Sequence, residues 1–128
     1  MLRSGANVRA MEWPGRIASV EEVDIETTRG AGAPIHRTTI WAVTGDGVVY
    51  VRSLNGKDGR WYRELIANPD AVLHAEGEAI PVRAVRTADP ESVERATRGF
   101  NEKYADSPYL HTMVRQEIEP TTVRLDPR

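Results

Sequence analysis

The 128-residue sequence contains no cysteine. Without a thiol the chain can form no disulfide, thiolate metal site, iron–sulfur cluster or cysteine nucleophile. It also lacks an apolar run of about 18 residues, the minimum for a membrane-spanning helix, and its first residues hold no apolar stretch typical of a signal peptide. These absences favour residence in the reducing cytoplasm and argue against a membrane partner.

The chain has almost no net charge, since 17 basic residues oppose 19 acidic ones. A balance this close gives no support for a nucleic-acid partner. The charges are nevertheless unevenly placed along the chain. Residues 12–26 hold five acids and one Arg, whereas residues 52–63 hold four basic residues against Asp58 alone. Any electrostatic function is therefore expected to be local.

The length fits a single domain that can bury one core without disulfides. Residues 1–18 mix Gly, Arg, Ala and Pro without sustained periodicity and are interpreted as an N-terminal arm. Residues 19–128 carry the periodic segments and form the predicted domain.

Segments that alternate in polarity or are rich in β-branched residues predict six strands. They cover residues 20–29, 36–43, 48–51, 71–75, 79–86 and 121–125. Asp46-Gly47 predicts a tight hairpin between the second and third strands, and Glu76-Gly77 predicts another between the fourth and fifth.

Three helices are predicted between these strands. Residues 60–67 place Trp61 and Leu65 four residues apart, Asp89-Pro90 caps a second helix, and Ser107-Pro108 precedes a third over residues 109–115. Neighbouring antiparallel strands with helices inserted at two points predict a mostly β (α+β) fold, a small six-stranded antiparallel β-barrel.

The loop after the third strand is the strongest candidate for a binding site. Ser53, a glycine-containing turn, Lys57 and Arg60 offer hydroxyl, backbone and cationic donors at the start of a helix, a combination that suits a phosphate. The alternative is a solvated basic loop that pairs with the acidic first strand. The local pattern leaves both interpretations open.

The three histidines match no zinc spacing, so no metal site is expected. His36 stands beside Arg37 on the second strand, near the candidate phosphate site, and is a candidate acid–base group. Trp41, Trp61 and Tyr62 either stack on a planar ligand or fill the core.

Three segments resemble the split β-barrel flavin- and deazaflavin-binding superfamily, the FMN-binding barrels related to pyridoxamine-phosphate oxidase. They are residues 34–41 (PIHRTTIW), 50–53 (YVRS) and 59–72 (GRWYRELIANPDAV). In deazaflavin-dependent reductases of that superfamily the strand commonly reads Pro-Arg-Thr-Thr-Pro and the helix Trp-Tyr-x-Asn-Leu-x-Ala-Asn-Pro-x-Val. This chain has Ile40 for the second Pro and Glu64 for the Asn. It looks closest to a small bacterial branch of unknown function, DUF2255.

The resemblance implies a split barrel that forms a homodimer and holds FMN or coenzyme F-420 at the dimer interface. It implies that Arg52, Ser53, Lys57 and Arg60 bind the cofactor phosphate, that Trp61 and Tyr62 lie near this anchor, and that Arg37, Thr38 and Thr39 border the ring. The extra carboxylate of Glu64 is unfavourable beside a phosphate unless it points away or pairs with Arg63 or Arg60.

The leading hypothesis is a flavin- or deazaflavin-dependent oxidoreductase that reduces a small planar organic substrate. In that case the cofactor carries the chemistry and no particular catalytic side chain is required. The alternative is a cofactor-free barrel that binds or transforms an anionic or polyketide-like molecule in the same cleft, with His36 or Tyr62 as the acid–base group. A structural or interaction domain is the third possibility, favoured if the acidic strand neutralises the basic loop.

Overall fold

The computed structural model describes residues 13–128, so most of the expected N-terminal arm lies outside the described residues. Its strands are β1 (Val23–Thr28), β2 (Ile35–Ile40), β3 (Ala42–Gly45), β4 (Val48–Val51), β5 (Asp70–Ala75), β6 (Glu78–Arg86) and β7 (Val123–Pro127). Its helices are α2 (Arg60–Ala67), α3 (Pro90–Lys103) and α4 (Leu110–Val114), with 3-10 turns η1 (Gly56–Asp58) and η2 (Gln116–Thr121). Residues 13–19 are also helical.

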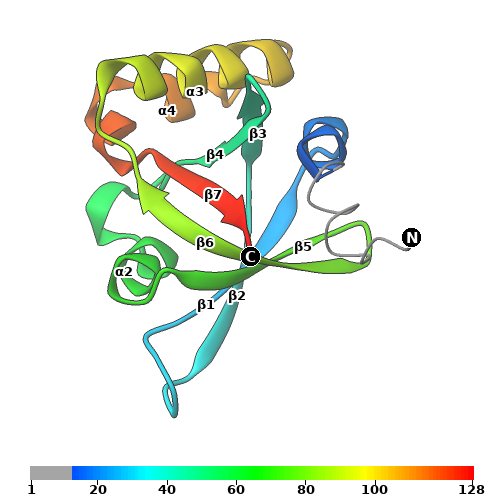
Figure 1. Ribbon diagram of the computed structural model, residues 1–128. Helices are drawn as coiled ribbons and strands as arrows, with labels where there is room; N and C mark the ends of the chain where they lie inside the picture. Colours follow the sequence, from blue (N-terminus) through cyan, green and yellow to red (C-terminus); the bar gives the residue numbers. More distant parts are fainter. Residues whose placement is uncertain (1–12) are drawn as a thin grey trace.

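The seven strands form one antiparallel sheet in the order β2-β1-β5-β6-β7-β4-β3. The sheet curls on itself, with α3 and α4 at one end and the β1–β2 hairpin projecting at the other (Figure 1). The predicted fold class, a mostly β antiparallel barrel with inserted helices, is confirmed. Consecutive strands β2 and β3 lie at opposite edges of the sheet, and the barrel is split between them.

The prediction of one continuous strand over residues 36–43 is wrong. Trp41 separates β2, which pairs with β1, from β3, which pairs with β4. The apolar run Ile40-Trp41-Ala42-Val43 reads as one strand because both halves are buried, but the chain changes partners at Trp41. The sheet therefore has seven strands where the sequence predicted six.

Both predicted hairpins are confirmed. Asp46 and Gly47 join β3 to β4 with positive φ angles of 52° and 78°, the conformation that two-residue hairpin loops favour. Glu76 and Gly77 join β5 to β6 in the same way, with φ angles of 50° and 80°. In each turn the glycine takes one of the two left-handed positions at little steric penalty, and Asp46 or Glu76 takes the other.

Two of the three predicted helices begin where predicted, whereas the third, α4, covers only Leu110–Val114 and is not capped by Ser107. The helix over residues 60–67 has its predicted bounds, and it buries Trp61 and Leu65 against the barrel. Asp89 accepts a hydrogen bond from the Ser92 amide at the start of α3. None of the helices within residues 13–128 is both long and apolar enough to cross a membrane.

The helical segment at residues 13–19 is joined to the barrel. Trp13 and Ile17 are buried in the main core. The Lys103 ammonium, at the end of α3, donates to the Ile17 carbonyl at 2.7 Å and to the Ala42 carbonyl at 2.6 Å. Burial lowers the pKa of Lys103 to about 8. One side chain thus ties the first helical segment, β3 and α3 together.

Replacing Gly99 with Ala is expected to destabilise the fold. An added Cβ would lie 2.8 Å from the Thr44 carbonyl oxygen and 3.0 Å from Val43 Cγ2, where α3 crosses β3. Overpacking of this kind costs about 1–3 kcal/mol, which exceeds the roughly 1 kcal/mol that Ala gains over Gly in a helix. Urea unfolding measures the difference. The exposed neighbour Arg98→Ala is the control, expected within about 0.5 kcal/mol of wild type, and equal midpoints for all three proteins would contradict the close packing.

Candidate functional site

A cleft of about 390 Å³ opens where the barrel is split. Its volume falls within the roughly 300–1,000 Å³ typical of small-molecule sites. The lining comes mainly from β2, the loop after β4, the first turn of α2, and α4, with Glu22 before β1 and Trp41 after β2. The lining residues are Glu22, Thr38, Thr39, Ile40, Trp41, Arg52, Leu54, Asn55, Trp61, Tyr109, Thr112 and Met113. Since β2 is an edge strand, the backbone N–H and C=O groups on one side of it are paired with no other strand of the sheet.

Aromatic rings form much of the cleft wall. Trp41 lies parallel to Tyr104, with ring centroids 3.8 Å apart and an interplanar angle of 5°. Trp61 enters from α2, and Tyr109 stands at the rim with 67% of its surface exposed. Stacked and apolar surfaces of this kind bind flat aromatic groups.

Thr38 supplies an unsatisfied polar group in the same cleft. Its Oγ1 atom is buried and has no hydrogen-bond partner within the described part of the chain. By contrast, the neighbouring cleft residue Thr39 donates to Asp24 at 2.7 Å. Buried hydroxyls without partners are uncommon in folded proteins, so the Thr38 hydroxyl marks a position where a ligand would gain a hydrogen bond.

Arg52, predicted to bind phosphate, lies under the cleft and bonds to the protein itself. It is 1% exposed, and it donates to Thr122 Oγ1, the Met113 and Val93 carbonyls, and Thr97 Oγ1 at 2.9–3.0 Å. Burial lowers the pKa of its guanidinium, an effect that the charge of Glu119 partly offsets. The side chain therefore anchors η2, α3 and α4 to the end of β4.

Ser53 is buried and does not line the cleft. Its side chain is fully buried, and its hydroxyl has no partner among the described residues. A Cβ at Gly59 would lie 2.5 Å from Ser53 Oγ, so only glycine fits over this hydroxyl. Ser53 thus packs beneath Gly59, the residue that precedes α2.

The remaining predicted ligands point in several directions. Arg37 lies on the outer face of β2, where it donates to Asp24 at 2.9 Å. Arg60 is exposed at the first position of α2. Lys57 and Tyr62 line a separate hollow. Of the nine predicted cofactor-binding residues, the structure brings Thr38, Thr39, Arg52 and Trp61 together around the cleft.

His36 forms a polar cluster with the buried carboxylate of Glu64 and with Thr27. Its Nδ1 lies 2.8 Å from Glu64 Oε2, and Thr27 donates to Glu64 Oε1 at 2.8 Å. Glu64 is 4% exposed. It forms no ion pair with Arg60 or Arg63, because the carboxylate turns inward from α2 to meet β1 and β2.

The Glu64 carboxylate is ionised in this cluster. Burial alone would raise its pKa, but hydrogen bonds from Thr27 and His36, together with the charges of His36 and Arg60, lower it below the usual value. An ionised carboxylate can only accept hydrogen bonds. His36 Nδ1 must therefore carry a proton, which leaves Nε2 as the basic nitrogen whenever the ring is neutral.

The other histidines are engaged elsewhere. His74 Nε2 lies 2.9 Å from Glu26 Oε1, and His111 Nδ1 lies 3.1 Å from the Pro108 carbonyl. Within residues 13–128, no three His, Cys, Asp or Glu side chains come together as a metal site.

Several cleft residues escaped sequence reasoning. Leu54, Tyr109 and Met113 reach the cleft from the loop after β4 and from α4. The only available signal was the apolar pattern of residues 109–115, which equally describes a helix packed on the core.

Replacing Arg52 with Lys is expected to destabilise the protein by at least about 2 kcal/mol, because several buried acceptors lose their donor. The measurement is the urea midpoint. Arg37→Lys is the matched control, since its ion pair with Asp24 is exposed and is worth about 1 kcal/mol or less. A midpoint for Arg52→Lys equal to that of Arg37→Lys would contradict the anchoring role.

Comparison with known proteins agrees with this architecture. No curated protein gives a significant match to the chain. Solved structures of similar fold include an F420-H2 dependent reductase (19% identity, TM-score 0.62, covering 84% of this chain and 94% of the other). They also include HutZ, the heme storage protein from Vibrio cholerae, with 12% identity and a TM-score of 0.62 over 99% of this chain and 92% of the other. A structure described as a domain-swapped dimer has 18% identity and a TM-score of 0.62 over 95% of this chain and 93% of the other. At these identities the likeness establishes the split-barrel fold. The family model described as "Uncharacterized protein conserved in bacteria (DUF2255)" matches residues 15–125, and the chain belongs to this family.

Proposed function

We propose that the cleft binds a planar, phosphate-bearing cofactor, FMN or coenzyme F-420, and that the protein reduces a small planar organic substrate. The observation that carries this proposal is the unpartnered Thr38 hydroxyl in a cleft walled by aromatic rings. The rings suit the faces of a fused heterocycle. The hydroxyl and the free edge of β2 suit the polar atoms around its rim.

The first turn of α2 is the best place for the cofactor phosphate. Gly59 precedes this helix without a side-chain cap, so amide groups of the first turn remain available to an anion. Arg60 stands beside them and forms no ion pair within the described residues. A bound flavin or deazaflavin would supply the hydride chemistry, while the protein orients the ring.

A second copy of the chain would complete the cleft. Leu54 and Tyr109 stand at its rim with 49% and 67% of their surfaces exposed. Burial of such apolar side chains drives association. One solved protein of the same fold is described as a domain-swapped dimer, and we include a homodimer in the proposal.

Titration of the purified protein with FMN and with coenzyme F-420, followed by absorbance and tryptophan fluorescence, tests this function. We expect one of the two to bind. Thr38→Val should weaken binding about tenfold, the effect of one lost hydrogen bond, without lowering stability. Thr112→Val is the control, because its hydroxyl already donates to the Tyr109 carbonyl. Binding of neither cofactor, or equal binding by both variants, would count against the cleft, and a monomer in light scattering would count against the dimer.

The His36–Glu64 pair favours a second candidate function, acid–base chemistry on a small anionic molecule without a cofactor. His36 lies two residues before Thr38 on the same face of β2, and Glu64 lies three residues after Trp61 on α2. Neither residue lines the cleft itself, but each lies one strand repeat or one helical turn from a residue that does, Thr38 and Trp61. A carboxylate that fixes Nδ1–H and leaves Nε2 basic is the arrangement of a general base. Tyr62 lines another hollow and does not join His36.

The tautomer of His36 tests this arrangement directly. In the neutral ring we expect the proton on Nδ1, observed in long-range proton–nitrogen spectra, and Glu64→Leu should release the ring to the other tautomer. His74 is the internal control, because its Nε2 faces Glu26 and should keep its own tautomer in both proteins. An unchanged His36 spectrum in Glu64→Leu would refute the positioning role of Glu64.

A further inference from the structure

A second hollow, of about 270 Å³, lies on a different side of α2 from the cleft. It is lined by Lys57, Tyr62, Arg63, Ile66 and Arg86. Trp61 lines the cleft and Tyr62 lines the hollow because adjacent helical residues point about 100° apart. The two sites share no lining residue.

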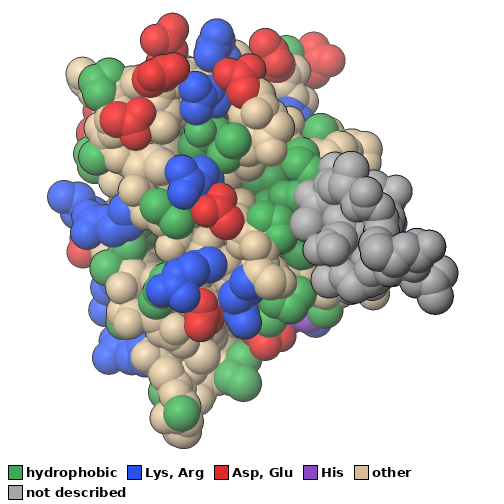
Figure 2. All heavy atoms as spheres, in the orientation of Figure 1, with side chains coloured by type: hydrophobic (Ala, Val, Ile, Leu, Met, Phe, Trp, Pro, Cys, Tyr) green, Lys and Arg blue, Asp and Glu red, His purple; other side chains and the backbone are tan. Residues whose placement is uncertain are grey.

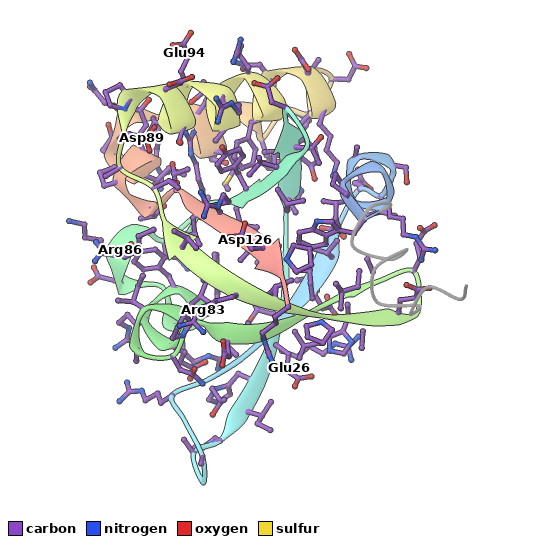
Figure 3. The ribbon with its side chains drawn as sticks, viewed as in Figure 1. Glu26, Arg83, Arg86, Asp89, Glu94 and Asp126 are labelled. Carbon is purple, nitrogen blue, oxygen red and sulfur yellow. The ribbon has the colours of Figure 1, made fainter. Side chains whose placement is uncertain are left out.

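The polar rim of this hollow is strongly basic. Lys57, Arg63 and Arg86 are exposed, and none of them forms an ion pair with another residue in the 13–128 region. Arg86 stands at the end of β6 (Figure 3), and Lys and Arg side chains gather along this side of the molecule (Figure 2). Asp58, next to Lys57, and Glu64, next to Arg63, are the nearest acids in sequence, and neither lines the hollow.

The acidic first strand does not neutralise these cations. Asp24 of β1 pairs with Arg37, and Glu26 pairs with His74. The basic loop therefore keeps its charge, which removes the sequence-based argument for an internally paired, inert surface.

Tyr62 points to a ligand independently of the charges. The residue is 4% exposed, and its hydroxyl is buried with no hydrogen-bond partner among the described residues. Such a hydroxyl normally bonds to protein or to ordered water. Here it belongs to a residue that lines a hollow rimmed by three cations.

We propose that this hollow binds the phosphate group of a small organic phosphate. Lys and Arg are hydrogen-bond donors without acceptor capacity, and charge-assisted bonds to phosphate are among the strongest in proteins. The Tyr62 hydroxyl supplies a neutral donor. Ile66, with 38% of its surface exposed, offers an apolar contact to the organic part of the ligand. This binding site is independent of the cofactor proposed for the cleft.

Calorimetric titration of the full chain at constant ionic strength tests the site with two probes, inorganic phosphate and phenyl phosphate. We expect both to bind, and phenyl phosphate to bind more tightly because of Ile66. Arg63→Gln and Arg86→Gln should each weaken binding about tenfold, as expected for one lost charge-assisted contact. Tyr62→Phe should weaken it several-fold while leaving the urea midpoint unchanged. Arg98→Gln, an exposed charge on α3, is the control and should bind like wild type.

The outcomes separate this proposal from the cofactor proposal. Loss of phosphate binding in the Arg63, Arg86 and Tyr62 variants, with cofactor binding unchanged, supports a distinct site. Absence of phosphate binding overturns the proposal. Equal weakening in Arg98→Gln also overturns it, because net charge alone would then account for the binding. Stronger binding of inorganic phosphate than of phenyl phosphate overturns the assignment to an organic phosphate. Failure of FMN and coenzyme F-420 to bind would leave these titrations unaffected.

Discussion

The buried guanidinium of Arg52 is the interaction on which the arrangement around the cleft depends. It extends from the end of β4 and reaches η2, α3 and α4 through four hydrogen bonds. Its Cζ atom also lies 5.4 Å from the centroid of the Phe100 ring. A charge buried without a carboxylate partner is costly unless its donors are satisfied. Here backbone carbonyls and threonine hydroxyls accept its hydrogen bonds. The segments α3, α4 and η2 are therefore held in one position beside the open side of the barrel.

That position creates the cleft. Because β2 and β3 occupy opposite edges of the sheet, the barrel stays open beside Trp41, and α4 together with the loop after β4 forms the facing wall. Side chains of the short helix α2 face three different surroundings. Trp61 faces the cleft, Glu64 faces the barrel strands, and Tyr62 faces the basic hollow. Eight residues of one helix thereby bring an aromatic cleft wall, a carboxylate–histidine pair and a basic hollow close together.

Local signals in the sequence predicted local structure well. Asp46-Gly47 and Glu76-Gly77 specified their turns, Asp89 specified the start of α3, and the Trp61–Leu65 spacing specified α2. The break at Trp41 escaped prediction because both halves of that apolar run are buried, and burial alone does not say which strand is the partner. The inward orientation of Glu64 escaped prediction for a similar reason. Its partners Thr27 and His36 lie 37 and 28 residues away.

The sequence by itself determined the mostly β antiparallel fold, the positions of the helices and hairpins, and a basic loop ahead of an aromatic helix. Turn chemistry, capping and periodicity act over a few residues, so they can be recognised in the chain. Only the tertiary structure decided which basic residues remain available. Arg52 became an internal anchor, Arg37 paired with Asp24, and Arg86 came from β6 to join Lys57 and Arg63. Burial and ion pairing depend on residues far apart in the sequence, and the closure of the sheet brings those residues together.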